Sequence, residues 1–105
     1  MVDLAASHLH EVRRILRAWV PECEVWAHGS RVTGRAVTWS DLDLVLLDPS
    51  NRLTWRDVER VKEAFACSDL PIMVDVCDWA GIGDELREVI QGCHEVIQVP
   101  GKEAP

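Results

Sequence analysis

The segment GSRVTGRAVTWSDLDLVLL, residues 29–47, joins a glycine-serine turn to a pair of aspartates that leads into an apolar strand. Because side chains alternate along a strand, Asp41 and Asp43 share one face and Leu42 and Leu44 share the other. Two carboxylates this close repel each other unless a cation lies between them, and hard oxygen ligands suit Mg²⁺. The backbone N–H groups of a Gly-Ser turn can hold a phosphate. The segment therefore predicts a phosphoryl- or nucleotidyl-transfer site.

The chain has 105 residues, of which 48% are hydrophobic, so it can form one small domain with its own core. This apolar content argues against global disorder. The 18 Asp and Glu residues outnumber the 11 Lys and Arg residues, which gives a net charge of −7. An acidic surface docks poorly on a nucleic-acid backbone, so we expect no direct contact with nucleic acid.

Two features of the sequence bear on its compartment. The N-terminal segment lacks the basic region and apolar stretch of a targeting signal, and the longest strongly apolar run, residues 44–47, is too short to cross a bilayer. The four cysteines contain no C-x-x-C pair and have the spacing of neither a zinc ribbon nor a dense disulfide framework. We therefore expect a cytoplasmic protein without membrane contact, whose cysteines are reduced and lie in or near the core.

Hydrophobic periodicity and turn residues predict the order of helices and strands. Helices are expected at residues 9–19, between residues 54 and 68, and at 84–91, and strands at 23–28, 42–47, 72–76 and, as a short final strand, 94–99. A short helical segment that Gly34 closes should follow the Gly-Ser turn. This order predicts an α/β or α+β domain over residues 1–99, with one mixed sheet of three to five strands flanked by helices. Residues 100–105 are expected to form a flexible tail.

Asp75, on the third predicted strand, is a candidate third carboxylate. It can join Asp41 and Asp43 only if the third strand lies beside the second, as sequential strands usually do. The helix predicted between these strands fits a parallel pair. Asp78 is a rival ligand, but it lies three residues further on and therefore on the opposite strand face.

Two common phosphate-binding motifs do not fit this sequence. Gly29 and Gly34 have the glycine spacing of a phosphate loop, but Arg35-Ala36 stands where that loop needs Lys and then Ser or Thr. A dinucleotide fingerprint needs a third glycine and a long helix, and neither follows.

The glycine-serine turn, ten intervening residues, the Asp-x-Asp on a strand and the later aspartate together resemble the DNA polymerase β-like nucleotidyltransferase superfamily. The chain most resembles the small bacterial and archaeal branch, the minimal nucleotidyltransferases (MNT). The resemblance spans residues 9–98 and is carried by residues 29–34, 40–44, 70–79, 86–90 and 96–98.

The resemblance implies a palm-like domain in which Asp41, Asp43 and Asp75 hold two Mg²⁺ ions. Asp75 would ligate the ion that activates the attacking hydroxyl. Gly29 and Ser30 would hold the β- and γ-phosphates of a nucleoside triphosphate, with ATP expected as the donor. Two such ions can stabilise both the attacking and the leaving oxygen of an in-line displacement.

Three more residues near the turn receive weaker assignments. Arg31 and Arg35 are expected as phosphate neighbours. His28 departs from the aromatic or aliphatic residue that many relatives carry at the mouth of the site, and we expect it to be structural.

The resemblance also implies a partner. Larger relatives carry a second, helical domain that completes the acceptor site, whereas this chain ends soon after the sheet. We therefore expect another molecule to supply the acceptor. Family members of this kind form one half of two-gene pairs with a small all-helical protein, which is either a substrate-binding subunit or a HEPN ribonuclease toxin. In the toxin case the nucleotidyltransferase is an antitoxin that adds AMP from ATP to a tyrosine of the toxin.

Two other functions stay open at this point. The domain could neutralise a helical partner by contact alone, without catalysis. It could also transfer a nucleotide to a small-molecule hydroxyl that the partner holds.

The remaining candidate residues have ordinary structural interpretations. Asp48 is expected to cap a loop, and Thr54 with Asp57 to form a capping arrangement. Trp39 is expected to pack over the edge of the core, and Trp79 is the tryptophan that we expect to contact a partner. Trp19, Trp26 and Trp55 are expected in the core or on a helix face, and His8, His10 and His94 at the surface.

Overall fold

A single four-stranded sheet organises the computed structural model, which describes residues 2–101. Its strands are β1 (Glu24–His28), β2 (Leu42–Leu47), β3 (Val74–Asp78) and β4 (Glu95–Gln98). The helices are α1 (Ala6–Trp19), α2 (Ser30–Thr33), α3 (Trp55–Ala66) and α4 (Asp84–Gly92), with a 3₁₀ turn η1 (Trp79–Gly81).

The strand order is β3-β2-β1-β4. Strand β1 is antiparallel to both of its neighbours, while β3 is parallel to β2 and reaches it through α3. The mixed sheet is therefore confirmed, as is the expectation that the third strand lies beside the second. A parallel pair needs a crossover of this kind, because a tight turn can join only antiparallel strands.

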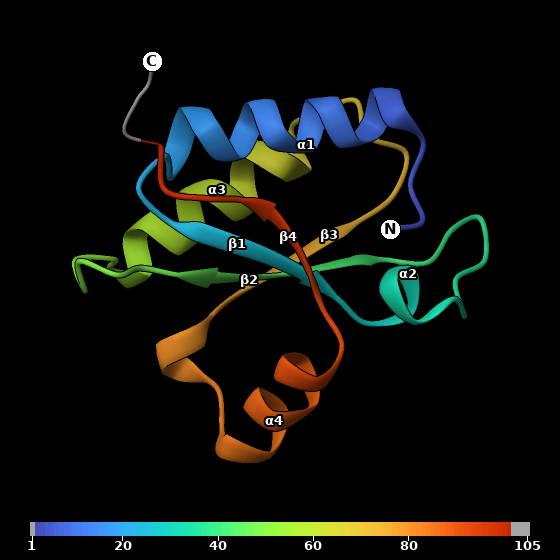
Figure 1. Ribbon diagram of the computed structural model, residues 1–105. Coiled ribbons are helices and arrows are strands. Elements are labelled where there is room, and N and C mark those ends of the chain that lie inside the picture. Colours follow the sequence, from blue (N-terminus) through green and yellow to red (C-terminus); the bar gives the residue numbers. More distant parts are fainter. Residues whose placement is uncertain (1, 102–105) are drawn as a thin grey trace.

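Helices cover both faces of the sheet (Figure 1). Helices α1 and α3 lie over one face, and α4 lies over the other. The core fills the space between the sheet and the first pair of helices. It includes the fully buried Val12, Leu16, Leu42, Leu44, Leu46 and Val61. Leu42, Leu44 and Leu46 alternate along β2, so the strand turns the intervening residues toward the face of α4.

Several predicted boundaries shift by two or three residues. Helix α1 begins at Ala6, three residues before the predicted start, and β3 begins at Val74 instead of residue 72. The ladder between β2 and β3 opens with the Leu42 N–H donating to the Met73 carbonyl at 2.9 Å, after the bend at residues 71–72. Of the predicted tail, Gly101 donates its N–H to the Pro21 carbonyl at 2.7 Å, and residues 102–105 lie outside the described residues.

The two predicted caps are confirmed. The Thr54 hydroxyl accepts from the Asp57 N–H at 3.3 Å, and the Asp57 carboxylate accepts from the Thr54 N–H at 2.9 Å, which completes a capping box. Asp48 accepts from the backbone N–H groups of Ser50 and Arg52 in the loop after β2. The carboxylates of Asp48 and Asp57 therefore accept hydrogen bonds from backbone N–H groups. Both residues follow β2 in the chain.

The expectations for cysteine and tryptophan hold only in part. All four cysteines are free, but only Cys23 is buried and Cys77 partly buried, whereas Cys67 and Cys93 are exposed, contrary to expectation. Among the tryptophans, Trp26 lies on β1 and stacks on His94, while the side chains of Trp19, Trp39 and Trp55 are more than half exposed. Trp39 in particular is 77% exposed, so the prediction that it packs over the core edge is wrong.

The longest described helix, α1, has 14 residues. No helix within residues 2–101 combines the length and the apolar composition that crossing a bilayer requires.

Candidate functional site

Three titratable side chains form a row across the sheet. Asp43 on β2 is in register with Asp75 on β3 and with His28 on β1. Residues directly opposite each other on neighbouring strands project from the same face, which here is the face of α4. Asp41 precedes Asp43 by two residues and is exposed at the start of β2. The fold thus places Asp75 directly opposite Asp43, while Asp41 lies just before the strand.

Gly29 brings the backbone close to this row. Its φ of 80° and ψ of −157° are a conformation that residues with a side chain rarely adopt. A β-carbon at this position would collide with the Asp43 carboxylate, whose Cγ would lie 3.2 Å away. The lack of a side chain therefore lets the Gly-Ser turn pass directly beside Asp43.

The turn continues into α2, which is only four residues long. The Gly29 carbonyl accepts from the N–H groups of Val32 and Thr33, both at 3.0 Å. The first N–H groups of a helix have no carbonyl partner within it, so those of Ser30 and Arg31 are the ones free of intrahelical bonds. Gly34 ends the segment in the left-handed conformation with φ of 87°, as predicted.

Arg31 has a structural task that the sequence did not reveal. Its side chain is only 6% exposed, and Nε donates to the Ser40 carbonyl at 2.9 Å. Nη1 donates to the Asp3 carbonyl at 2.7 Å, and Nη2 donates to the Thr38 carbonyl at 3.0 Å. The guanidinium thereby holds the loop before Asp41 against the N-terminal segment. These bonds engage the guanidinium of Arg31 with carbonyls, and the expectation that Arg31 neighbours a phosphate stays a prediction.

Arg35 remains available for a ligand. Its side chain is exposed, and the structure assigns it neither a hydrogen bond nor an ion pair within the described residues. Its position directly after Gly34 is next to the Gly-Ser turn.

The pKa values of Asp43 and His28 are both shifted within this row. Burial raises the pKa of Asp43, and the charges of Asp75 and Asp41 raise it further, against the opposing effect of His28. Burial lowers the pKa of His28, although Asp43 and Asp75 oppose this shift. The Nε2 atom of His28 is buried and lacks a hydrogen-bond partner within the described part of the chain. Sequence reasoning placed His28 at the mouth of the site but gave no sign that it faces Asp43.

The donor chemistry of the three aspartates fits a hard divalent cation. Their carboxylates are not in any ion pair among residues 2–101. Across the same residues, no three His, Cys, Asp or Glu side chains stand close enough together to enclose a metal ion. The aspartates would therefore have to turn toward one another to share one.

Asp78, the rival third ligand, caps η1 instead. Its carboxylate accepts from the Ala80 N–H at 3.1 Å. Trp79 packs edge-on against Trp26 with ring centroids 5.4 Å apart, and His94 stacks on Trp26 at 3.9 Å. The expectation that His94 lies at the surface is therefore wrong, because its ring is held between α4 and the sheet.

A groove of about 550 Å³ opens beside Asp75. We call it the β3-edge groove, because it follows the outer strand of the sheet. Besides Asp75, it is lined mainly by Phe65, Ala66, Leu70, Ile72 and Met73, with Lys62 at its rim. Sequence reasoning missed this feature, because a groove between α3 and β3 exists only once the two elements are packed.

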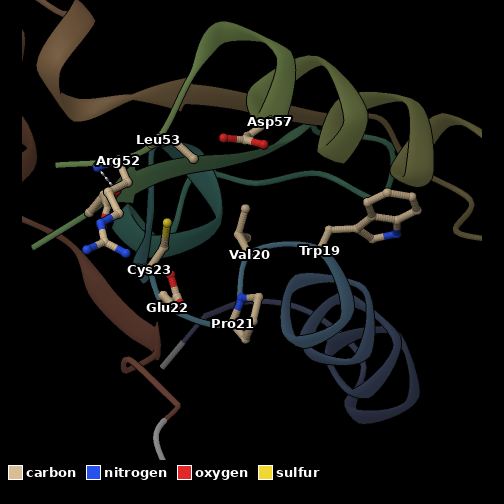
Figure 2. Close-up of a pocket in the computed structure, with 9 residues that line it drawn as sticks. Trp19, Val20, Pro21, Glu22, Cys23, Arg52, Leu53 and Asp57 are labelled. Atoms are coloured by element: carbon tan, nitrogen blue, oxygen red, sulfur yellow. Dashed lines mark hydrogen bonds between the residues drawn. The ribbon is translucent and has the colours of Figure 1, made fainter. Parts of the chain in front are cut away.

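A second hollow lies at the far end of the sheet and is lined by none of the predicted site residues. It measures about 150 Å³ and lies where α1 passes into β1. Figure 2 shows Trp19, Val20 and Cys23 on one side of it and Leu53 and Asp57 on the other. Burial raises the pKa of the Cys23 thiol to about 12, so this cysteine is a protonated core residue.

Comparison of the sequence with known proteins gives two matches. The family described as poly(A) RNA polymerase, mitochondrial-like, central palm domain matches residues 2–99. A probable protein adenylyltransferase MntA from Haemophilus influenzae is 43% identical over 97 residues, which cover 92% of this chain and 84% of that protein.

Two of the solved structures with a similar fold contain toxin–antitoxin proteins. A crystal structure of a toxin–antitoxin with AMP-PNP has a TM-score of 0.73 at 20% identity, covering 87% of this chain and 73% of that chain. A structure of tri-AMPylated Shewanella oneidensis HEPN toxin in complex with MNT antitoxin has a TM-score of 0.67 at 17% identity, covering 89% of this chain and 71% of that chain. At these identities the likeness establishes the fold.

Proposed function

The chain belongs to the MNT-type nucleotidyltransferases of the polymerase β-like superfamily, and from this membership we infer that it is a protein adenylyltransferase. It transfers AMP from ATP to a hydroxyl group of a helical partner protein. The observation that carries this proposal is the register of Asp43 with Asp75 beside the Gly29 turn, in a chain 43% identical to a probable protein adenylyltransferase.

The site residues divide into two groups in this proposal. Gly29 and Ser30 hold the β- and γ-phosphates, and the exposed Arg35 adds a positive charge beside them. Asp41, Asp43 and Asp75 would hold Mg²⁺. When bound there, divalent ions supply Lewis-acid stabilisation of the charge that develops on the transferred phosphoryl group.

The reaction is an in-line displacement at the α-phosphorus of ATP. The acceptor oxygen forms a bond to that phosphorus, while the bond from the α-phosphorus to the bridging oxygen of the β-phosphate breaks. Pyrophosphate leaves with the electron pair, and the hydroxyl proton passes to Asp75 on the acceptor side. The protein contributes positioning of the two reactants and a preorganised site.

A HEPN-type toxin is the acceptor that the comparisons favour. One similar structure holds a tri-AMPylated HEPN toxin with an MNT antitoxin, and another toxin–antitoxin structure holds AMP-PNP. We propose that this chain acts in the same way, as the antitoxin of such a pair. A cytoplasmic location agrees with its four free cysteines.

The test is incubation of the protein with ATP labelled in the α-phosphate, Mg²⁺ and the helical protein encoded by the adjacent gene. We expect the label to appear on the partner and pyrophosphate to be released. Asp41→Asn/Asp43→Asn should transfer no label, and omission of Mg²⁺ should have the same effect. An unlabelled partner would contradict the proposal, and full protection of cells by the double variant would favour neutralisation by contact alone. Label on a small hydroxyl compound instead would favour the two-subunit transferase.

A further inference from the structure

The β3-edge groove ends at Asp75, on the side of the row that faces away from the Gly-Ser turn. We propose that this groove binds an extended, apolar and basic segment of the protein that receives AMP, with the accepting hydroxyl at the Asp75 end. This inference rests on the proposed function and assigns the surface that recognises the acceptor.

The strand order places the two reactants on opposite sides of Asp43. The Gly29-Ser30 turn follows β1, which flanks β2 on one side, and Asp75 lies on β3, which flanks it on the other. In an in-line displacement the attacking and leaving oxygens lie on opposite sides of the phosphorus. Because the leaving pyrophosphate belongs at the turn, the hydroxyl must arrive from the side of β3. The groove is the surface that the structure provides there.

The walls of the groove suit apolar side chains. Phe65, Leu70 and Ile72 contribute apolar surface, and Met73 leaves 74% of its side chain exposed next to the site. Met73 is also held in place, because its carbonyl accepts from the Leu42 N–H at 2.9 Å at the start of the β2–β3 ladder. An exposed, flexible methionine can adapt its packing to a partner side chain.

The backbone of β3 suits an extended segment. Strand β3 is the outer strand of the sheet, with β2 on one side only, so alternate N–H and C=O groups along it point away from the sheet. A chain that pairs with such an edge gains main-chain hydrogen bonds and directs every second side chain into an adjacent pocket.

The negative charge around the groove favours an acceptor segment that carries basic residues beside its hydroxyl. Asp75 lies at its end, with Asp43 and Asp41 beyond, and Asp69 is exposed close to Leu70. Lys62 at the rim is within 3.5 Å of Glu59, which offsets its charge. With two Mg²⁺ ions bound, the three carboxylates and the triphosphate together still carry a net negative charge. A segment with Lys or Arg near the hydroxyl is therefore attracted, and an acidic one is repelled.

The experiment compares variants in AMP transfer to the helical partner protein, with separate titrations of ATP and of the partner. Met73→Ser should raise the KM for the partner about tenfold, the factor expected when most of the burial of a methionine is lost. Met73→Leu should behave like the unmodified protein. Ala66→Gln, which narrows the groove, should also raise the partner KM. The KM for ATP should not change in any of these variants.

Val99→Ser is the matched control. Val99 is 59% exposed directly after β4, the strand at the opposite edge of the sheet from β3, and the groove predicts no effect there. If both Met73→Ser and Ala66→Gln transfer AMP with an unchanged KM for the partner, the groove does not bind the acceptor. The proposed adenylyltransferase function would still stand. If the unmodified protein labels no partner, the groove fails together with the proposed function.

Discussion

The carboxylate of Asp43 occupies the space into which a side chain on Gly29 would project. The turn that is proposed to hold phosphate and the strand that carries the aspartates are therefore packed against each other with no room for a methyl group. Through this contact, a glycine and an aspartate from different segments of the chain form one site.

Replacement of Gly29 tests this contact. Gly29→Ala adds a β-carbon that collides with Asp43, at a backbone conformation with φ of 80°. We expect unfolding to become easier by about 3 kcal/mol and AMP transfer to be lost, because strain and a steric clash add together. Thermal unfolding and the labelled-ATP assay measure the two effects.

Gly34→Ala is the matched control for that variant. Gly34 also has a positive φ, at 87°, but nothing lies within 4 Å of an added β-carbon. It should therefore lose only about 1 kcal/mol of stability, from backbone strain alone. Equal losses in the two variants would show that the contact with Asp43 is unimportant.

Neutralisation of Asp43 should stabilise the protein while it abolishes transfer. Burial and the charges of Asp75 and Asp41 disfavour the ionised form of Asp43, which is why its pKa is raised. Asp43→Asn removes that charge with little change of shape. In metal-free buffer at pH 7 we expect the midpoint of thermal unfolding to rise, because the folded state no longer holds this disfavoured charge.

The pH dependence of this gain follows from the direction of the pKa shift. The folded state keeps the Asp43 proton at pH values where the unfolded state, with an ordinary pKa of 3.8, has already lost it. Stability therefore falls as the pH rises from about 3.8 through the raised pKa. The gain in unfolding free energy of Asp43→Asn over the parent protein should be full at pH 7 and disappear near pH 3.5. A variant that unfolds more easily than the parent at pH 7 would contradict this account.

Arg31 should be required for stability, in contrast to Arg35. Arg31→Lys loses the planar group that donates to the Ser40, Asp3 and Thr38 carbonyls, and a single ammonium cannot reach all three. We expect a loss of about 2–3 kcal/mol, because several partly buried hydrogen bonds of a charged donor are lost together. Denaturant unfolding measures the loss.

Arg35→Lys and Arg35→Met supply the comparison on the same segment. Arg35 is exposed, so both variants should unfold like the parent. Arg35→Met should weaken ATP binding if this charge lies beside the triphosphate, whereas Arg35→Lys should retain most of it. An Arg31→Lys protein as stable as Arg35→Lys would contradict the structural role of Arg31.

The four thiols should react in two groups. Cys67 and Cys93 are exposed, while burial raises the pKa of Cys23 to about 12 and that of Cys77 to about 11. The thiolate is the reactive form, so alkylation at pH 8 should modify Cys67 and Cys93 quickly and the other two slowly. Mass spectrometry of the time course measures the alkylation rates. In denaturant, all four thiols should react at similar rates. Fast modification of Cys23 in the folded protein would contradict its burial.

Much of the fold and of the site could be predicted from local patterns. The apolar residues of β2, the capping box at Thr54 and the closing glycine at Gly34 are local signals, and each is confirmed. Because Asp41 and Asp43 are two residues apart, strand alternation predicts a common face for them, although β2 begins only at Leu42. The sequence also suggested that β3 pairs with β2, since a helical crossover joins them.

Other features depend on contacts between distant segments. Nothing local distinguishes Arg31 from Arg35, yet one is buried among backbone carbonyls and the other is exposed. Trp39 is exposed and His94 is half-buried against Trp26 for the same reason, because burial depends on which element packs against a residue.

The sequence by itself determined the residue types of the site, the alternation that predicts a common face for Asp41 and Asp43, and the family to which the chain belongs. Only the tertiary structure decided that Asp75 and His28 flank Asp43 in one row, that Gly29 passes directly beneath its carboxylate, and that a groove leads to Asp75. The physical reason is the range of the forces involved. Periodicity and backbone conformation act over a few residues, whereas strand register, burial and cavities arise when distant segments pack.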